Sequence, residues 1–223
     1  TGRLFISAGG FGKHKRMLEL ARAFGESRTG PEDRLVLFGY QKPTEDGDAY
    51  LDACDAVDGV KTVLGASRDE VLDALAEADV YVMNSEWEGF GLVLLESMLN
   101  GCPWIANVGA GAAGDLSCLG QTYDDDLGLK RLIEEAPPRS ERRSAALRAI
   151  ARSRFTVSST VDQLHRAVAN SELMPESSRR VFRRALPPPP PPPLTIDCCH
   201  HACSDENITS KRRVHATTAP TIG

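Results

Sequence analysis

The sequence predicts a doubly wound, Rossmann-like α/β domain built on a parallel sheet. Short apolar segments alternate with segments of helical periodicity from the amino terminus to about residue 153. The apolar segments are nearly continuous in hydrophobic residues, which is typical of strands with helices on both faces. Hydrophobic residues make up 41% of the 223 residues, which is enough for a substantial core. In sheets of this kind, ligands bind in the loops at the carboxyl ends of the strands.

Five strands and seven helices follow from this alternation. The expected strands are short apolar runs at residues 3–8, 34–38, 60–64, 80–83 and 104–107. The expected helices have apolar residues at spacings of three and four, and they cover residues from about 15, 44–57, from 67, 92–100, 127–135, 140–153 and 158–173. Ser67 and Glu70 have the spacing of a capping box at the start of one helix, and Gly101 and Pro103 end another.

The composition changes near residue 174. Residues 1–174 carry 19 Lys and Arg against 27 Asp and Glu, whereas residues 175–223 carry 7 against 4 and contain 9 of the 14 prolines. Seven consecutive prolines, residues 187–193, favour polyproline II over helix or strand. We therefore expect a folded domain over residues 1–174 and a disordered proline-rich tail over residues 175–223. This tail either recruits a proline-recognition domain or is a mispredicted extension.

Charge and hydropathy exclude several classes of function. The domain is acidic, which argues against nucleic-acid binding. The longest apolar runs, such as residues 92–95, are too short to cross a bilayer. The domain's cysteines lack paired spacing, which favours a reducing compartment, and we expect a cytoplasmic protein or one at the cytosolic face of a membrane. The sequence opens at Thr1 without a signal peptide, so we expect a piece of a longer protein.

A glycine-rich loop follows the first expected strand. It reads Gly9-Gly10-Phe11-Gly12-Lys13-His14-Lys15, and it matches neither the dinucleotide fingerprint nor the P-loop, because Lys15 and His14 occupy positions where those motifs need other residues. Backbone N–H groups at a helix start, together with Lys13 and Lys15, nevertheless attract phosphate. The alternative is a solvated basic turn.

A second loop follows the fourth strand and contains Glu88-Gly89-Phe90-Gly91-Leu92. Its glycines allow a close approach of the backbone to a ligand, and the N–H groups from Phe90 onward lie free at a helix start. Glu96 shares a helix face with Leu92, Leu95 and Leu99, and we expect that face to be buried. A buried carboxylate needs a bound ligand or a buried arginine as its partner.

Other residues with possible functions have simpler interpretations. Asp124, Asp125 and Asp126 precede an expected helix, whose dipole favours them as a cap over a metal site. Trp87 and Trp104 are expected in the core or in a pocket wall. The cysteines and histidines of residues 198–203 lack a second ligand pair at zinc-finger spacing, so we expect no metal site.

The second loop carries a family resemblance. Residues 88–105 read EGFGLVLLESMLNGCPWI, which is similar to the E-x7-E motif of GT-B-fold glycosyltransferases, where retaining family 4 members read E-G-F-G-L-P-L-L-E-A-M-A-x-G-x-P-V-I. The resemblance covers about residues 3–172 and implies the C-terminal, donor-binding half of such an enzyme. It also implies a separate N-terminal Rossmann-like domain, which we expect to lie outside these 223 residues.

The resemblance assigns a role to each matching residue. Lys15 would bind the donor diphosphate and Glu88 would hold hydroxyls of the donor sugar, which makes these two the catalytic candidates. Glu96 would accept from the ribose hydroxyls. The remaining donor-binding candidates lie in loops whose backbone would meet the donor, with Leu64 and Gly65 at the base: Gly10, Lys13, Leu64, Gly65, Gly89, Phe90, Gly91 and Leu92. Gly10 stands where many relatives carry an arginine, and Lys13 would substitute for it.

The implied function is transfer of a sugar, with retention of configuration, from a nucleotide-diphosphate sugar to an unknown sugar, lipid or protein acceptor. The resemblance implies chemistry without a metal or other cofactor, because basic side chains and helix dipoles stabilise the leaving diphosphate. The alternative is a non-catalytic nucleotide-sugar-binding module. Gly10 favours that alternative, whereas the presence of both Glu88 and Glu96 opposes it.

Overall fold

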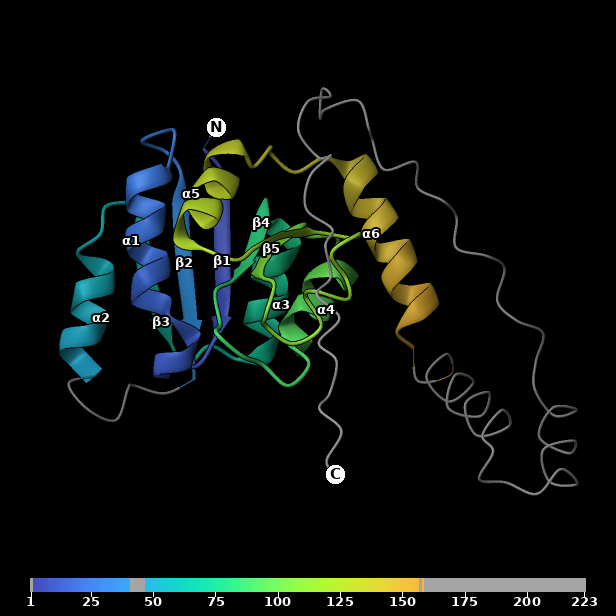
Figure 1. The fold of residues 1–223 in the computed structure, drawn as a ribbon, viewed down its shortest axis with the longest axis horizontal. Coiled ribbons are helices and arrows are strands. Elements are labelled where there is room, and N and C mark those ends of the chain that lie inside the picture. The colour runs from blue at the N-terminus through green and yellow to red at the C-terminus, as the bar shows by residue number, and fades with distance from the viewer. Residues whose placement is uncertain (1, 41–46, 157, 159–223) are drawn as a thin grey trace, which may run out of the picture. The chain divides into compact units, whose positions relative to one another are not determined.

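The computed structural model describes residues 2–40, 47–156 and 158. In this part of the chain a six-stranded sheet carries helices on both faces (Figure 1). The strand order is β3-β2-β1-β4-β5-β6 and every neighbouring pair is parallel. The strands are β1 (Leu4–Gly9), β2 (Arg34–Gly39), β3 (Val60–Leu64), β4 (Val80–Met83), β5 (Trp104–Asn107) and β6 (Gln121–Tyr123). This order confirms the doubly wound α/β fold.

The described residues form six α-helices. They are α1 (Met17–Ser27), α2 (Gly47–Asp55), α3 (Arg68–Glu77), α4 (Leu92–Leu99), α5 (Asp126–Glu135) and α6 (Glu141–Arg154), and the short 3-10 helix η1 (Lys13–Lys15) precedes α1. Helices α1 to α4 connect successive strands from β1 to β5, and α5 and α6 follow β6. The capping box predicted at Ser67 and Glu70 is confirmed at the start of α3. The helix expected at residues 158–173 and the proline-rich tail lie outside the described residues, apart from Ser158.

The two faces of the sheet build two hydrophobic cores. Because side chains alternate along a strand, Phe5 contributes to one core and Ile6 to the other. The first core joins the sheet to α1, α2 and α5, and the second joins it to α3, α4 and α6. Trp104 lies in the second core and is 1% exposed, as the sequence predicts. Strands covered on both faces explain the nearly continuous apolar runs.

Two elements differ from the sequence-based expectation. Helix α1 begins at Met17 and not near Lys15, because Arg16 adopts a left-handed conformation (φ 51°) that separates η1 from α1. Strand β6 was not expected. It has only three residues, Gln-Thr-Tyr, and pairs with β5 at the edge of the sheet, so it has no apolar run to reveal it.

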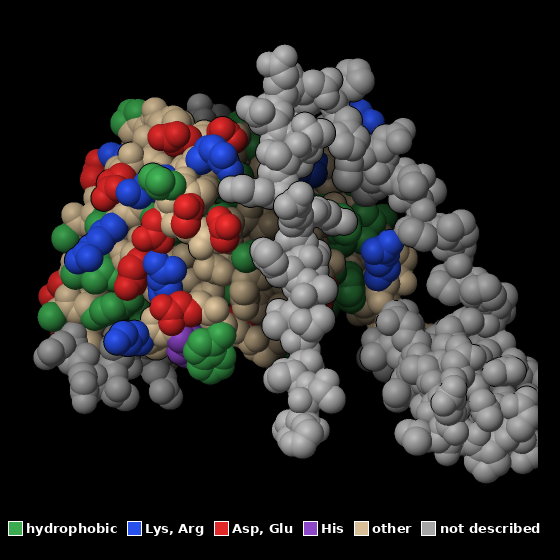
Figure 2. Space-filling model, viewed as in Figure 1, with side chains coloured by type: hydrophobic (Ala, Val, Ile, Leu, Met, Phe, Trp, Pro, Cys, Tyr) green, Lys and Arg blue, Asp and Glu red, His purple; other side chains and the backbone are tan. Residues whose placement is uncertain are grey.

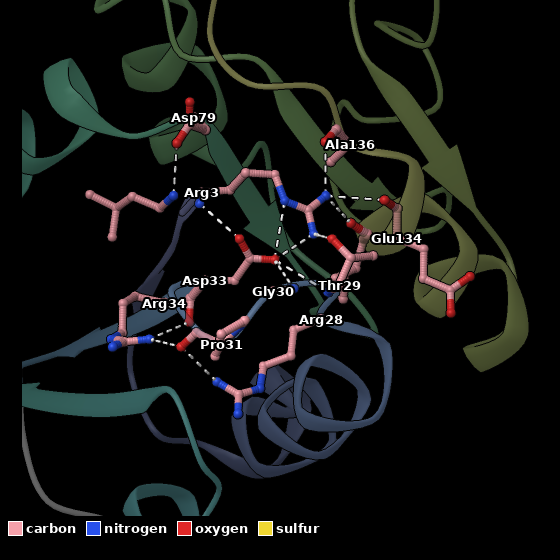
Figure 3. A network of polar contacts seen from close by, with 12 residues as sticks. Arg3, Arg28, Thr29, Gly30, Pro31, Asp33, Arg34, Asp79, Glu134 and Ala136 are labelled. Carbon is pink, nitrogen blue, oxygen red and sulfur yellow. Dashed lines mark hydrogen bonds and ion pairs between the residues drawn. The ribbon is translucent and has the colours of Figure 1, made fainter. Parts of the chain in front are cut away.

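A buried polar network lies at the amino end of β1 (Figure 3). The Arg3 guanidinium donates to Asp33 Oδ2 at 2.6 Å and to the carbonyl oxygens of Ile133 (2.9 Å) and Ala136 (2.8 Å) at the end of α5. The Arg3 backbone N–H donates to Asp33 Oδ1 at 2.8 Å. This network joins β1, the turn before β2 and the carboxyl end of α5. It lies at the amino ends of the strands, opposite the edge where the strands end and the two candidate loops begin.

Candidate functional site

The candidate site lies where the direction of strand addition reverses. Strand β1 has β2 on one side and β4 on the other, and the chain adds strands outward from this point in both directions. Loops that follow two such neighbouring strands diverge to opposite faces of the sheet and leave a crevice between them, where ligands of doubly wound sheets bind. Strands β1 and β2 point downward in Figure 1, so their carboxyl ends lie at its lower edge. The glycine loop follows β1, and the Glu88 loop follows β4.

Lys15 and Glu88 meet across this crevice. The Lys15 ammonium forms an ion pair with Glu88 Oε1, and both side chains are largely buried, with 16% and 20% exposed. Ser85 Oγ donates to the same carboxylate oxygen at 2.9 Å. The aliphatic part of the Lys15 side chain lies over Gly9, which directs the ammonium toward the β4 loop. The structure therefore brings together the two residues predicted to be catalytic.

Asn84 anchors the first loop to the second, a role that the sequence did not reveal. Its side-chain amide donates to the Arg16 carbonyl at 2.9 Å and accepts from the Tyr123 hydroxyl at 2.6 Å, and Asn84 is 1% exposed. The Glu86 backbone N–H donates to the His14 carbonyl at 2.8 Å. These bonds hold the left-handed Arg16 in place, and thereby fix the direction in which Lys15 projects. The position of Asn84 directly after a buried strand was the sequence feature that could have indicated this role.

The Glu88 loop itself rests on the loop that follows β5. The Ala112 N–H donates to the Phe90 carbonyl at 3.0 Å. Gly111 has a φ of 56°, and a Cβ atom there would overlap the Phe90 carbonyl oxygen, so this close approach requires glycine. Gly91 caps α4 with a φ of 82° and turns the chain into that helix. Residues 88–91 are thus held by backbone contacts, and the N–H groups at the start of α4 face the loop edge.

Glu96 occupies a different environment from the one predicted. Leu92, which shares its helix face, is 67% exposed, and the buried residues of α4 are Leu94, Ser97 and Met98. Leu95 and Leu99 on the same face are partly buried and pack against the second core, so the expected burial of this face is confirmed except at Leu92, in the first turn of α4. The Glu96 side chain is 16% exposed, and its partner is Arg68 Nη2 at 2.6 Å, an arginine that is 73% exposed and not buried.

A buried tyrosine lies close to both carboxylates. Tyr81 is 1% exposed, and burial, followed by the negative charges of Glu88 and Glu96, raises the pKa of its hydroxyl. Tyr81 comes from β4 and faces the core that contains α3 and α4. Both carboxylates therefore act on the same end of β4, although eight positions separate them in the sequence.

The other candidates lie in the loops at this edge. Lys13, Leu64 and Phe90 are exposed, and Gly10 and Gly89 are in the two loops. Trp87 is 63% exposed and not in the core; its ring stacks on His14 at 4.6 Å between ring centroids. In Figure 2 the purple histidine lies beside a large hydrophobic side chain at the lower edge.

The acidic run before α5 is a helix cap, as predicted. Asp125 accepts from the Gly128 N–H at 2.6 Å, and Asp126 pairs with Arg16 at 2.9 Å.

Within the ranges that the structure describes, no group of three or more His, Cys, Asp or Glu side chains could hold a metal ion. None of the described helices is both long enough and apolar enough to span a membrane.

Comparison with known proteins decides the family. The profile of the family described as Glycosyl transferases group 1 matches residues 1–122. The chain belongs to the group 1 glycosyltransferases. This group 1 domain is 31% identical over 107 residues to the N-acetyl-alpha-D-glucosaminyl L-malate synthase of Bacillus anthracis, covering 46% of this chain and 26% of that protein. It is 32% identical over 129 residues to the glycogen synthase of Mycobacterium tuberculosis, covering 53% and 31%.

Solved structures share the fold of this group 1 domain. Anabaena HepE in complex with UDP and glucose superimposes with a TM-score of 0.60 at 19% identity, over 76% of this chain and 49% of that chain. The trehalose-6-phosphate synthase OtsA gives a TM-score of 0.55 at 14% identity, over 68% and 40%. The chain therefore spans between a quarter and a third of the curated relatives above, and less than half of these two structures.

Proposed function

We propose that this domain is the donor-binding half of a retaining, nucleotide-sugar-dependent glycosyltransferase of family 4. The observation that carries the proposal is the meeting of Lys15 and Glu88 at the point where strand order reverses. A cation and a carboxylate at this point can bind two parts of a nucleotide-sugar donor. The cation can bind the diphosphate, and the carboxylate can accept hydrogen bonds from the sugar hydroxyls. Glu96, on the helix that follows, suits the ribose.

Lys15 can serve the diphosphate without leaving Glu88. An ammonium has three donors, and one of them is used by Glu88, so two remain for phosphate oxygens. Positive charge at this position stabilises the negative charge that builds on the departing nucleoside diphosphate. In the transfer, the anomeric carbon exchanges its bond to the diphosphate oxygen for a bond to the acceptor oxygen, and the proton of the acceptor hydroxyl passes to the departing diphosphate. We propose that no metal takes part.

We propose that the acceptor binds between this domain and a second domain. The curated relatives are three to four times longer than the segments that match, so most of each relative lies outside this domain. A structure related in fold holds UDP and glucose, and another is described as a UDP-forming trehalose-phosphate synthase. UDP and UDP-glucose are therefore the first donor ligands to test, and the acceptor class is left to the second domain.

Calorimetric titration of the full chain with UDP, GDP and ADP tests the donor site. We expect one nucleotide to bind, with an affinity that falls roughly 10- to 100-fold in Lys15→Ala, because a charge-assisted hydrogen bond contributes about 1.5–3 kcal/mol. Glu96→Ala should also weaken binding. Lys61→Ala, an exposed lysine on β3, is the matched control and should leave the affinity unchanged. A folded protein that binds none of the three nucleotides would overturn the donor site.

A second measurement separates an enzyme from a binding module. We expect slow release of glucose from UDP-glucose with water as the acceptor, and the glucose should appear first as the α anomer in NMR spectra. Glu88→Gln should abolish this rate while UDP still binds, because Glu88 faces the sugar and not the nucleotide. Binding of UDP-glucose without any turnover in a longer protein that includes the second domain would favour the non-catalytic module.

A further inference from the structure

The side chain of Arg68 links two loops of the candidate site. Arg68 is the first residue of α3 and follows the short loop that begins at Gly65, directly after Leu64 at the end of β3. Its Nη2 atom lies 2.6 Å from Glu96 Oε1 on α4. Among the residues that the structure describes, Arg68 supplies the only hydrogen bond to the Glu96 carboxylate. Glu96 is also the only charged residue of α4. The orientation of this carboxylate thus depends on one arginine.

Helix α3 gives no reason for an arginine at this position. A positive charge in the first turn of a helix is unfavourable, because the amino end of the helix dipole is itself positive. Asp69 and Glu70 have the sign that the dipole prefers, and Ser67 with Glu70 already caps the helix. With 73% of its side chain exposed, Arg68 adds little to the core. The contact with Glu96 is therefore the interaction that accounts for an arginine at this position.

We propose that Arg68 is a positioning residue that orients Glu96 toward the ribose and thereby sets a preference for ribonucleotides over 2′-deoxyribonucleotides. This inference rests on the proposed function of the site. A carboxylate has about four lone-pair sites on its two oxygens. Because Arg68 uses one of them on Oε1, the remaining sites of Oε1 and all of Oε2 are left for the 2′- and 3′-hydroxyls.

The link also couples recognition of the base to recognition of the ribose. The Gly65 N–H donates to the Gly39 carbonyl at 2.9 Å, which ties the β3–α3 loop to the end of β2. A Cβ atom on Gly65 would meet no atom within 4 Å, so its outer side is open. From the first position of α3, at the end of this loop, the side chain of Arg68 reaches α4. A nucleotide whose base lies against residues 64–65 therefore has its ribose beside a carboxylate that the same loop holds in place.

The test compares a nucleotide with its 2′-deoxy form on the full chain. UDP, GDP and ADP and the three matching 2′-deoxynucleoside diphosphates are titrated into the wild type, Arg68→Ala, Arg68→Lys and Arg142→Ala. Arg142 is an exposed arginine on α6 and provides the control for loss of one positive charge. Thermal melting shows that each variant is folded.

We expect Arg68→Ala to weaken ribonucleotide binding by up to about fivefold, the range for an ion pair with one exposed partner, and to weaken 2′-deoxynucleotide binding less. The ratio of the two affinities should therefore fall. Arg68→Lys should restore part of the ratio, and Arg142→Ala should leave it unchanged. In a Glu96→Gln background, Arg68→Ala should have no further effect on the ratio, because Arg68 acts through Glu96.

Two results would overturn the inference, and they differ. If the wild type binds no nucleotide, the proposed function fails and this inference with it. If the wild type binds a nucleotide but Arg68→Ala leaves the ratio unchanged, the inference alone fails. An equal loss of affinity for both nucleotides that persists in the Glu96→Gln background would show that Arg68 contacts the ligand directly, which also contradicts the proposal.

Discussion

Two buried charges at the amino end of β1 stabilise each other. The side chains of Arg3 and Asp33 are 9% and 5% exposed, and the guanidinium donates to oxygen atoms and lies over the ring of Phe5. Burial by itself raises the pKa of Asp33, but hydrogen bonds from Arg3 and its positive charge outweigh it and lower the pKa to about 2. The carboxylate is therefore stabilised in its ionised form, and removing it leaves a buried cation unpaired.

Asp33→Asn should lower the free energy of unfolding by about 3–5 kcal/mol at pH 7, the usual cost of breaking a buried ion pair. The folded pKa of Asp33 lies below its ordinary value of 3.8, so its contribution is present above about pH 4 and is lost as the pH falls toward 2. The difference between wild type and variant should shrink by about 2 kcal/mol over this range. Denaturant unfolding at pH 7 and pH 2.5 measures it.

The control for this prediction is a surface ion pair. Asp58 pairs with Arg28 but is 86% exposed, so Asp58→Asn should cost less than about 1 kcal/mol. A pH dependence of Asp58→Asn as large as that of Asp33→Asn would show that general charge effects, and not the buried network, set the acid sensitivity.

At the scale of the element, helix α3 illustrates how local sequence defines a helix start. The Glu70 N–H donates to Ser67 Oγ at 3.2 Å, and the Ser67 N–H donates to Glu70 Oε2 at 2.7 Å. Two N–H groups that helix geometry leaves unpaired are thus satisfied. Helix α6 begins with a weaker cap, in which Ser140 Oγ accepts from the Arg143 N–H at 3.4 Å without a reciprocal bond.

Ser67→Ala should destabilise the domain by about 1–2 kcal/mol and Ser140→Ala by about 0.5 kcal/mol, because the first removes part of a reciprocal pair. The Ser67 N–H and, to a smaller extent, the Ser67 hydroxyl hold the pKa of Glu70 below its ordinary value of 4.5, and Ser67→Ala keeps the N–H and removes only the contribution of the hydroxyl. The advantage of Ser67 over Ser140 should therefore be present above pH 4.5 and should decrease as the pH falls below it. Thermal unfolding at pH 7 and pH 3.5 compares the two variants; an equal cost at pH 7 would contradict the prediction.

At the scale of the whole molecule, each of the two hydrophobic cores contains one buried cysteine, whose reactivity can be used to follow unfolding of that core. Cys54 lies in the core with α1, α2 and α5, and Cys102 lies in the core with α3, α4 and α6. Burial raises the pKa of Cys54 to about 11 and that of Cys102 to about 12, so neither thiol is reactive in the folded domain. Cys118 is exposed.

The two cores share the strands of one sheet, so we expect them to unfold together. In pulse labelling with a thiol reagent at increasing urea, Cys54 and Cys102 should become reactive at the same midpoint, while Cys118 reacts without denaturant. Peptide-level mass spectrometry distinguishes each site from the cysteines of the tail. Exposure of Cys54 at a lower urea concentration than Cys102 would show that the α2 side opens separately.

The sequence predicted much of the site but not its assembly. The residues of the two loops and the motif that joins Glu88 to Glu96 are visible in one dimension, because glycine spacing and charge at a helix start are local features. Asn84 and Arg68 were missed because each acts on a residue that is distant in the chain. The exposure of Leu92 was also missed, because helical periodicity does not show which turn of an apolar helix packs against the sheet.

By itself, the sequence determined the alternation of strands and helices, the start of α3, the buried position of Trp104 and the family motif. Each of these depends on periodicity, capping or spacing within about 20 residues. Only the tertiary structure decided that β1 lies between β2 and β4, that Arg16 is left-handed, and that Lys15 meets Glu88, 73 positions away. Strand order and long-range pairing follow from the packing of both cores at once, and no local pattern contains that information.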